Sequence, residues 1–429
     1  MDQFIIEGGK ALHGYITPGG NKNEALPCVC AALLGGAPVT LRNLPRIRDV
    51  NVLLDILCSL GAAVEELDSP NEVRIDASNL QSSSPDSKLC SQIRASILLA
   101  GPLLARMQNL LLPPPGGDVI GRRRVDTHFS GFQALGASFS VNDSYELHAP
   151  SGLTGADILF DEASVTATEN VVMAAVFAKG TTILRNVASE PHVQGLCRML
   201  ISMGAHINGV GSNTLIIEGT DSLHGCDYTI GPDYLEVGSM MGLAACTNSD
   251  ITIRGAGRGD LRMVRMVFEK LGVHAEDVGI DDLRISPNQE LIIRQDLHGS
   301  IPRIDDAPWP AFPTDLMSIA IVTATQSAGT VLFFEKMYEG RMFFVDHLIG
   351  MGAKIILCDP HRVVVVGPSA LYGSRVESPD VRAGMALVIA ALAAKGQTTI
   401  GNIRQIDRGY ERLDEKLRAL GASIERVHA

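Results

Sequence analysis

The stretch PPPGGDVIGRRRVDTH, residues 113–128, carries much potential chemistry for its length. Its prolines and glycines predict a loop, which presents one carboxylate, Asp118, shortly before Arg122, Arg123 and Arg124. A loop carboxylate can take up or release a proton, and clustered arginines can hold phosphate or carboxylate groups. A solvated turn with a local salt bridge is the simpler interpretation, and the rest of the chain must decide between the two.

Two other segments could act on anionic substrates. GGNKNEALP places Lys22 and Asn23 directly before an apolar helix, and helix N-termini attract anions. PAFPTD presents Asp315 from a loop that its prolines stiffen. Three arginines follow in the same half of the chain: Arg341, Arg382 and Arg408. Taken singly these are more simply a solvated lysine, a turn aspartate and surface arginines, so only their combination points to a site.

The composition limits the class of protein. A chain of 429 residues predicts two or three domains, and its net charge of −12 argues against non-specific nucleic-acid binding. The eight cysteines are scattered without a CxxC pair, which favours buried free thiols in a reducing compartment. No segment has the pattern of a signal peptide or the length of a membrane span, so we expect a cytoplasmic protein that does not act at a membrane.

An internal repeat of about seventy residues organises the chain. LGA or a close variant recurs six times, at 60–62, 135–137, 203–205, 271–273, 351–353 and 420–422. Each copy ends a helical pattern that follows a β-branched strand, and another strand comes after it. The glycine fits the position after a helix end, where a positive φ is favourable. Between the copies lie helices that are apolar on most faces and must be buried. We predict six α/β modules, grouped as two domains of three.

Six such modules with these motifs resemble the enolpyruvyl transferases, in particular those that act on UDP-N-acetylglucosamine. The resemblance spans essentially the whole chain. It implies a two-domain inside-out α/β barrel, with residues 1–21 plus 230–429 in one domain and 22–229, including the active-site loop 113–124, in the other. It also implies transfer of the enolpyruvyl group of phosphoenolpyruvate to the sugar 3-hydroxyl by addition and elimination. No cofactor, metal or obligatory protein partner is implied.

The resemblance also assigns roles to residues of the inserted domain. Lys22 matches a lysine that contacts the phosphate of phosphoenolpyruvate and is counted with the catalytic residues. Asn23 matches a contact to phosphoenolpyruvate and to the sugar near its reacting hydroxyl. Arg123 is the arginine of GRRRVDTH that contacts phosphoenolpyruvate and the diphosphate, while Arg124 replaces a usual proline. The remaining sugar-nucleotide contacts implied are Arg94, Arg124, Val125, Asp126, Thr127, Ser164, Val165 and Thr166. Ser164 could instead be only a helix cap paired with Glu169, and the family usually has glycine where Thr166 stands.

In the other domain the resemblance makes Asp315 the general-base candidate at the attacking hydroxyl. Met337 and Arg341 would lie near the sugar nucleotide. Arg382 and Arg408 match arginines at the phosphoenolpyruvate carboxylate and phosphate, and Arg408 is counted with the catalytic residues. One departure is Tyr234, where the family has an arginine near the hinge.

Most family members have a cysteine at position 118, whose thiol is the proposed acid of the addition step. We expect Asp118 to replace it as a working acid, and the protein to be insensitive to fosfomycin, which alkylates that thiol. Three alternatives stay open: an acceptor of the UMP type, for which Tyr234 and Trp309 leave room; shikimate 3-phosphate as acceptor; and a non-catalytic paralogue that binds nucleotide sugars.

Overall fold

The computed structural model describes residues 2–117 and 124–428, which form two compact units. The described residues up to Gly19 and from Pro232 onward form the first unit. Those between Gly20 and Gly231 form the second. Each unit has its own hydrophobic core, one built mainly on Phe4 and the residues after Pro232, the other on residues between Ala25 and Ile230.

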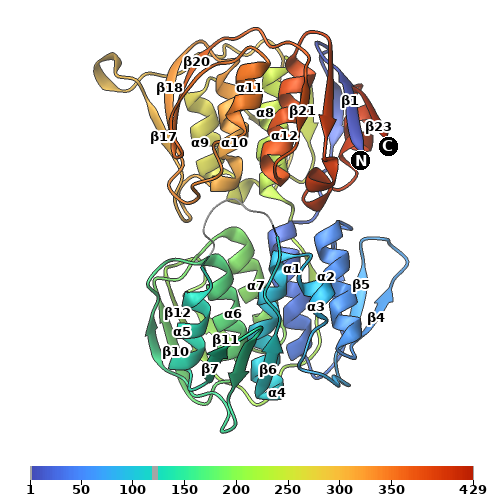
Figure 1. The fold of residues 1–429 in the computed structure, drawn as a ribbon, viewed down its shortest axis with the longest axis vertical. Coiled ribbons are helices and arrows are strands. Elements are labelled where there is room, and N and C mark those ends of the chain that lie inside the picture. Colours follow the sequence, from blue (N-terminus) through green and yellow to red (C-terminus); the bar gives the residue numbers. More distant parts are fainter. Residues whose placement is uncertain (1, 118–123, 429) are drawn as a thin grey trace. The chain divides into compact units, whose positions relative to one another are not determined.

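The second unit contains three sheets around buried helices (Figure 1). Their strand orders are β13-β3-β5-β4, β6-β8-β7 and β11-β12-β10-β9. The strands are β3 (Val39–Arg42), β4 (Ala63–Glu66), β5 (Val73–Asp76), β6 (Asn109–Leu112), β7 (Ser138–Val141), β8 (Tyr145–His148), β9 (Asp157–Leu159), β10 (Thr181–Arg185), β11 (His206–Asn208), β12 (Thr214–Glu218) and β13 (Asp227–Thr229). The inner helices are α1 (Lys22–Ala31), α4 (Ala100–Met107) and α6 (Val165–Ala175), and the others are α2 (Arg48–Ser59), α3 (Ser87–Cys90), α5 (Asp126–Ala134) and α7 (Pro191–Ser202).

The first unit repeats this plan with three four-stranded sheets, ordered β21-β22-β1-β23, β15-β16-β14-β2 and β17-β18-β20-β19. The strands are β1 (Gln3–Glu7), β2 (His13–Ile16), β14 (Asp250–Ile253), β15 (Glu276–Val278), β16 (Asp282–Ile285), β17 (Arg303–Asp305), β18 (Gly329–Phe334), β19 (Lys354–Asp359), β20 (Arg362–Gly367), β21 (Arg375–Glu377), β22 (Gln397–Gly401) and β23 (Ser423–Val427). The inner helices, α8 (Tyr234–Cys246), α10 (Met317–Ala324) and α12 (Val381–Ala393), pack against one another. The outer helices are α9 (Arg262–Lys270), α11 (Val345–Gly350) and α13 (Leu413–Ala419). The sheets lie outside the helices, as an inside-out barrel requires (Figure 1).

The predicted helix ends at LGA occur in all six modules. The glycines Gly61, Gly136, Gly204, Gly272, Gly352 and Gly421 have φ between +84° and +107°. In every copy the next residue donates its N–H to a carbonyl in the last helical turn, at 2.9–3.1 Å, as in Ala353 N to Leu348 O. This is the Schellman arrangement, in which glycine accepts the positive φ and the helix's last carbonyls gain donors. The same turn therefore closes each outer helix and starts the strand that follows.

The apolar segment that begins at Arg94 is only partly α-helical. Residues Arg94–Leu99 form the 3₁₀ helix η2, and the α-helix α4 starts only at Ala100. Pro102 has no N–H to donate to the carbonyl of residue 98, so a continuous α-helix through this point would lack a hydrogen bond. The remaining 3₁₀ helices are η1 (Ala32–Leu34), η3 (Arg258–Asp260), η4 (Leu297–Gly299), η5 (Thr314–Leu316) and η6 (Ile403–Arg408).

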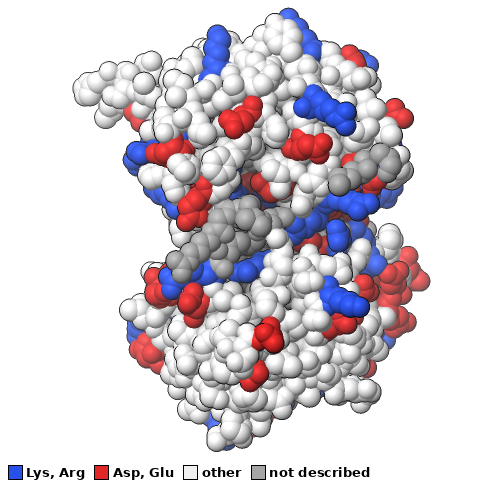
Figure 2. Space-filling model, viewed as in Figure 1, with Lys and Arg blue, Asp and Glu red and all other residues white. Residues whose placement is uncertain are grey.

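The cysteines, the surface charges and the helix lengths can be compared with the sequence-based expectations. All eight cysteines are free, but Cys58 and Cys358 are exposed, so the expectation of buried thiols holds for only part of the set. Basic and acidic side chains are interspersed on the face of each unit shown in Figure 2. Within the described residues, none of the helices has both the length and the apolar character needed to cross a membrane.

Candidate active site

Several predicted site residues stand where the inner helices begin. Lys22 is the first residue of α1, Arg94 the first of η2, and Val165 the first of α6. In the first unit Asp315 lies in η5, directly before α10, and Arg382 is the second residue of α12. The unpaired N–H groups of a helix start favour negative charge, so these positions suit residues that meet anions.

Asp315 is held by two arginines of the same unit. Its Oδ1 accepts a hydrogen bond from Arg341 Nη1 at 2.8 Å, and its Oδ2 one from Arg382 Nε at 3.1 Å. The arginine side chains are only 8% and 6% exposed, while that of Asp315 is 25% exposed. The carboxylate is thus the part of this cluster that solvent reaches most easily.

The charge state of Asp315 follows from these neighbours. Burial alone would raise its pKa, but the charges of Arg382 and Arg341 and their hydrogen bonds outweigh burial and hold the pKa well below its ordinary value. Asp315 is therefore ionised at neutral pH. An ionised carboxylate can accept a proton, although one so strongly stabilised is a weak base until its arginines are engaged elsewhere.

Each of the two arginines that bind Asp315 also has one N–H donor that makes no hydrogen bond within the described residues. Arg341 Nε and Arg382 Nη1 are buried and meet no acceptor among the described residues. The Arg382 guanidinium lies 5.4 Å from the centre of the Tyr410 ring, whose hydroxyl is 2.8 Å from Ser239 Oγ. A buried donor without an acceptor is unfavourable, so an anionic ligand would complete this cluster.

Two other predicted residues lie in this unit. Arg408 is 8% exposed at the end of η6 and donates to Gln405 Oε1 at 2.9 Å. Met337 follows Glu335 in the segment that leads to Arg341, and its N–H donates to Glu335 Oε1 at 3.0 Å. The sequence does not point to Glu335, because nothing local to it indicates a site.

In the second unit Lys22 forms an ion pair with Asp49 of α2. Lys22 Nζ lies 2.8 Å from Asp49 Oδ2, and their side chains are 12% and 5% exposed. The turn before Lys22 is fixed by Asn21, whose Oδ1 accepts from the N–H groups of Asn23 and Glu24. The helix start thus holds Lys22 and Asn23 in defined positions, as the sequence predicts.

The described part of the loop that leads toward Asp118 packs on residues 91–94. A Cβ at Gly116 would lie 1.8 Å from Ser91 O, and one at Gly117, where φ is +109°, would lie 2.8 Å from Arg94 Cβ. Only glycine allows both approaches. The pair therefore brings the loop against Arg94. Asp118 and Arg123, with Arg122, lie outside the described residues.

A chain of hydrogen bonds leads from Asn170 through His128 to Thr166. Asn170 Oδ1 accepts from Gly101 N, so its Nδ2 is the donor and reaches His128 Nδ1 at 2.9 Å. His128 Nε2 is 3.0 Å from Thr166 Oγ1. Burial, followed by the charge of Arg94, lowers the pKa of His128 to about 3, so the ring is neutral at pH 7. Its one proton must then be on Nε2 and be donated to Thr166, which leaves the Thr166 hydroxyl proton for another acceptor.

The start of α5 is tied to the segment before α6. Thr127 Oγ1 donates to Asp161 Oδ1 at 2.7 Å, and Arg124 pairs with Asp126 at 3.1 Å and with Asp161 at 3.5 Å. Val125 stands at the N-cap position of α5. Arg124 is thus paired with two carboxylates of the described residues. The local salt bridge that the sequence allowed concerns Asp118, which lies outside the described residues.

The capping interpretation of Ser164 is wrong. Ser164 is at the N-cap of α6, but its side chain makes no capping hydrogen bond to a described residue, and Glu169 lies too far along the helix to complete a capping box.

Tyr234 is buried and meets the ring of Trp309 edge-on, with centroids 6.1 Å apart. The residue that replaces the family's arginine therefore packs against an aromatic neighbour.

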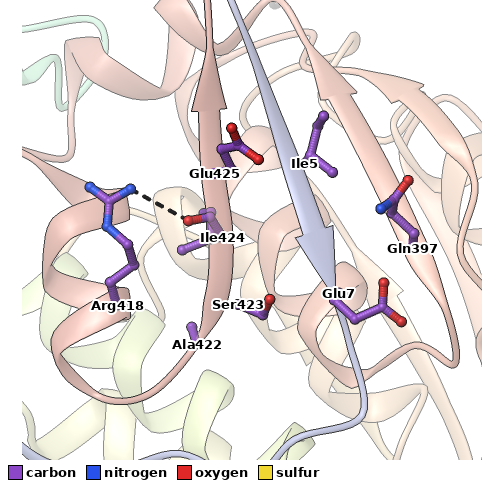
Figure 3. Close-up of a pocket in the computed structure, with 8 residues that line it drawn as sticks. All are labelled: Ile5, Glu7, Gln397, Arg418, Ala422, Ser423, Ile424 and Glu425. Carbon is purple, nitrogen blue, oxygen red and sulfur yellow. Dashed lines mark hydrogen bonds between the residues drawn. The ribbon is translucent and has the colours of Figure 1, made fainter.

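One hollow of about 480 Å³ lies away from these residues, over the strands β22, β1 and β23 (Figure 3). Its charged lining residues are Glu7, Glu425 and Arg418, and the arginine donates to Ile424 O at 3.4 Å. Two carboxylates beside one engaged arginine do not suit an anionic substrate. Across the described residues there is also no group of three or more His, Cys, Asp or Glu arranged to hold a metal ion.

Comparisons with known proteins show the family of this chain. The family model for EPSP synthase (3-phosphoshikimate 1-carboxyvinyltransferase) matches residues 6–417. The chain is 56% identical over 425 residues to a UDP-N-acetylglucosamine 1-carboxyvinyltransferase from Bradyrhizobium diazoefficiens, covering 99% of this chain and 98% of that protein. It is 53% identical to the protein of that name from Treponema denticola, with 99% of each chain covered.

Solved structures confirm the fold class. The enolpyruvyl transferase NikO from Streptomyces tendae superposes with a TM-score of 0.88 at 25% identity, over 100% of this chain and 99% of the other. An EPSP synthase from Acinetobacter baumannii gives a TM-score of 0.77 at 18% identity, with 100% of each chain covered. The second likeness concerns the fold alone.

Proposed function

The chain belongs to the enolpyruvyl transferase family, among its UDP-N-acetylglucosamine 1-carboxyvinyltransferases, and from this premise we propose its reaction and the residues that perform it. It transfers the enolpyruvyl group of phosphoenolpyruvate to the 3-hydroxyl of UDP-N-acetylglucosamine and releases phosphate. This reaction is the first committed step of peptidoglycan synthesis. The observation that carries the assignment of residues is the cluster of Asp315 with Arg341 and Arg382.

The addition step forms a bond between the sugar oxygen and C2 of phosphoenolpyruvate. The hydroxyl proton goes to a base, for which we propose Asp315, and C3 gains a proton from an acid, for which we propose Asp118. The elimination step then breaks the bond between C2 and the phosphate oxygen, while C3 returns a proton to Asp118 and the hydroxyl proton held by Asp315 passes to the departing phosphate. Sugar nucleotide and phosphoenolpyruvate thus become enolpyruvyl sugar nucleotide and phosphate, with no net change in protons beyond those of the phosphate.

The arginines link substrate binding to the strength of the base. Phosphoenolpyruvate carries a carboxylate and a phosphate, and the free N–H groups of Arg341 and Arg382 are suited to such anions. A substrate anion beside these arginines weakens their hold on Asp315 and raises the pKa of its carboxylate. Asp315 therefore becomes a better base when phosphoenolpyruvate is present. Lys22, Arg123 and Arg408 supply further positive charge to the phosphate.

The sugar nucleotide is assigned to Asn23, Arg94 and the two helix starts at residues 124–127 and 164–166, together with Met337 and Arg341. The oriented hydroxyl of Thr166 adds a donor at a position where the family usually has glycine. Small-molecule substrates are the only partners proposed. Eight free cysteines support a reducing compartment, so we place the enzyme in the cytoplasm.

An acceptor comparison tests the proposal. Phosphate release from phosphoenolpyruvate is measured with UDP-N-acetylglucosamine, UMP and shikimate 3-phosphate in separate reactions. We expect turnover with the first alone. Turnover only with UMP or shikimate 3-phosphate would assign another acceptor, and binding of the sugar nucleotide without turnover would indicate a non-catalytic paralogue.

A further inference from the structure

Two buried carboxyl groups, Asp306 and Glu335, lie behind the loop that carries Asp315. Strands β17 and β18 are parallel, with Asp305 paired to Phe334, and Asp306 and Glu335 directly follow the ends of these strands. The ends of neighbouring parallel strands meet at one sheet edge, so the strand register brings the carboxyl groups together. Both residues are 0% exposed.

The hydrogen bonds around the two groups cannot be satisfied if both are ionised. Asp306 Oδ1 accepts from Lys336 N at 2.6 Å, but Asp306 Oδ2 is buried and has no donor among the described residues. Glu335 Oε1 accepts from the N–H groups of Met337 and Tyr338, each at 3.0 Å. A proton between the carboxyl groups would give Asp306 Oδ2 its missing donor and remove the repulsion between two buried charges.

Glu335 also connects the two segments that build the Asp315 cluster. Thr314 Oγ1 donates to Glu335 Oε2 at 2.9 Å, directly beside Asp315. The backbone of Met337 and Tyr338 donates to the same carboxyl group, shortly before Arg341. One side chain therefore fixes both the loop that presents Asp315 and the turn that presents its partner Arg341.

We propose that Asp306 and Glu335 share one proton, so that Glu335 is held as a neutral acid and serves as a positioning residue for Asp315. Its effect on catalysis rests on the proposed function, whereas the shared proton does not. Other charged groups face the pair as well. Arg341 acts from the segment before α11, and His361 Nδ1 lies 2.7 Å from the backbone oxygen of Glu335. Lys336 turns its ammonium group to Asp305 instead.

The direction of the titration supports this arrangement. Burial, then the hydrogen bond with Asp306 and the Asp306 charge, raise the pKa of Glu335 from 4.5 to about 8, while the charge of Arg341 and the Thr314 hydrogen bond oppose the rise. The folded protein therefore keeps a proton that the unfolded chain loses above its lower pKa. The stabilising contribution of this group is complete below the unfolded pKa and is lost as the pH rises through the folded value.

Glu335→Gln tests the idea, because the amide imitates a neutral acid without a titrating proton. We expect it to fold, to keep kcat within a few-fold of the parent at pH 6.5, and to lose the fall in activity and in thermal midpoint between pH 7 and 9. Glu335→Ala should lower kcat roughly 10- to 100-fold through misplacement of Asp315, with a smaller change in KM. Asp306→Asn should also flatten the alkaline limb. Glu66→Gln, at an exposed carboxyl of the other unit, is the matched control and should leave both profiles unchanged.

Each contrary result overturns the inference. A folded Glu335→Gln as inactive as Glu335→Ala would show that the ionised carboxylate is needed. Failure of Glu335→Gln to fold, or an alkaline limb identical to that of the parent, would show that no shared proton is present. If the parent turned over none of the acceptors, the proposed function would fail, while the thermal midpoints would still decide whether the proton is shared.

Discussion

Arg341 Nη1 lies 2.8 Å from Asp315 Oδ1, which places the proposed base in direct contact with a nearly buried cation. Arg382 binds the other carboxylate oxygen. Both carboxylate oxygens of Asp315 are therefore engaged, and we propose that a substrate anion releases them by competing for the arginines. This contact holds the pKa of Asp315 well below its ordinary value, and under the proposed function it ties proton abstraction to the presence of phosphoenolpyruvate.

Asp315→Asn should lower kcat by about 100-fold or more, because the amide cannot accept the hydroxyl proton. It should also destabilise the fold at pH 7. The folded pKa of Asp315 is below its unfolded value, so its stabilising effect is present above the unfolded pKa and is lost as the pH falls through the folded one. Urea unfolding of both proteins at pH 7 and pH 3 checks this. A stability difference that grows on acidification would contradict it.

Asp49→Asn should raise the KM for phosphoenolpyruvate roughly ten-fold, corresponding to about 1.4 kcal/mol, because the Lys22 ammonium loses its charged partner. Steady-state kinetics at saturating sugar nucleotide measure the change. Asp157→Asn is the matched control, since it removes the partner of Arg185 in an exposed ion pair. Equal effects of the two variants would show that Lys22 has no special role.

Thr166→Ala should lower stability by about 1–3 kcal/mol, because the buried Nε2–H of His128 loses its acceptor. It should also raise the KM for the sugar nucleotide with little change in kcat. Thr166→Ser keeps the hydroxyl and should restore both properties. If alanine and serine behaved alike, the oriented hydroxyl would be irrelevant to binding.

The sequence was a reliable guide to the modules. The LGA glycines were predicted from their place after helical patterns, and all six have positive φ. The helix start at Lys22 also followed from local pattern. The contact of Asp315 with Arg382 could not be derived locally, because 67 residues separate them and only the packing of α10 on α12 brings them together. Glu335 was missed because strand register, which a single sequence leaves open, is what places it beside Asp306.

The helix ends offer a test of the repeat itself. Gly421→Ala should cost about 1–2 kcal/mol, the penalty for a side chain at positive φ, since the described residues leave open space around the added Cβ. Gly272→Ala should cost more, because its Cβ would also lie 2.4 Å from Ile292 N. Thermal unfolding compares the two. A Gly421→Ala variant that is the less stable of the pair would contradict this account of the turn.

Asp118 is the proposed acid that protonates C3 of phosphoenolpyruvate, and its replacement tests this role. Fosfomycin should neither label nor inactivate the protein, because a carboxylate replaces the thiol that it alkylates. Asp118→Ala should lose most activity yet bind the sugar nucleotide, and Asp118→Cys should stay active and become sensitive. Mass spectrometry after incubation with fosfomycin reads out the adduct. Time-dependent inactivation of the parent with an adduct at Asp118 would refute this role.

The central claim is that this chain moves an enolpyruvyl group onto UDP-N-acetylglucosamine. The most direct measurement is mass spectrometry of the sugar nucleotide after incubation with enzyme and phosphoenolpyruvate, with phosphate counted in the same sample. We predict a product heavier by one enolpyruvyl group and one phosphate released for each product formed. An unchanged sugar nucleotide, with phosphoenolpyruvate left intact, would contradict the claim.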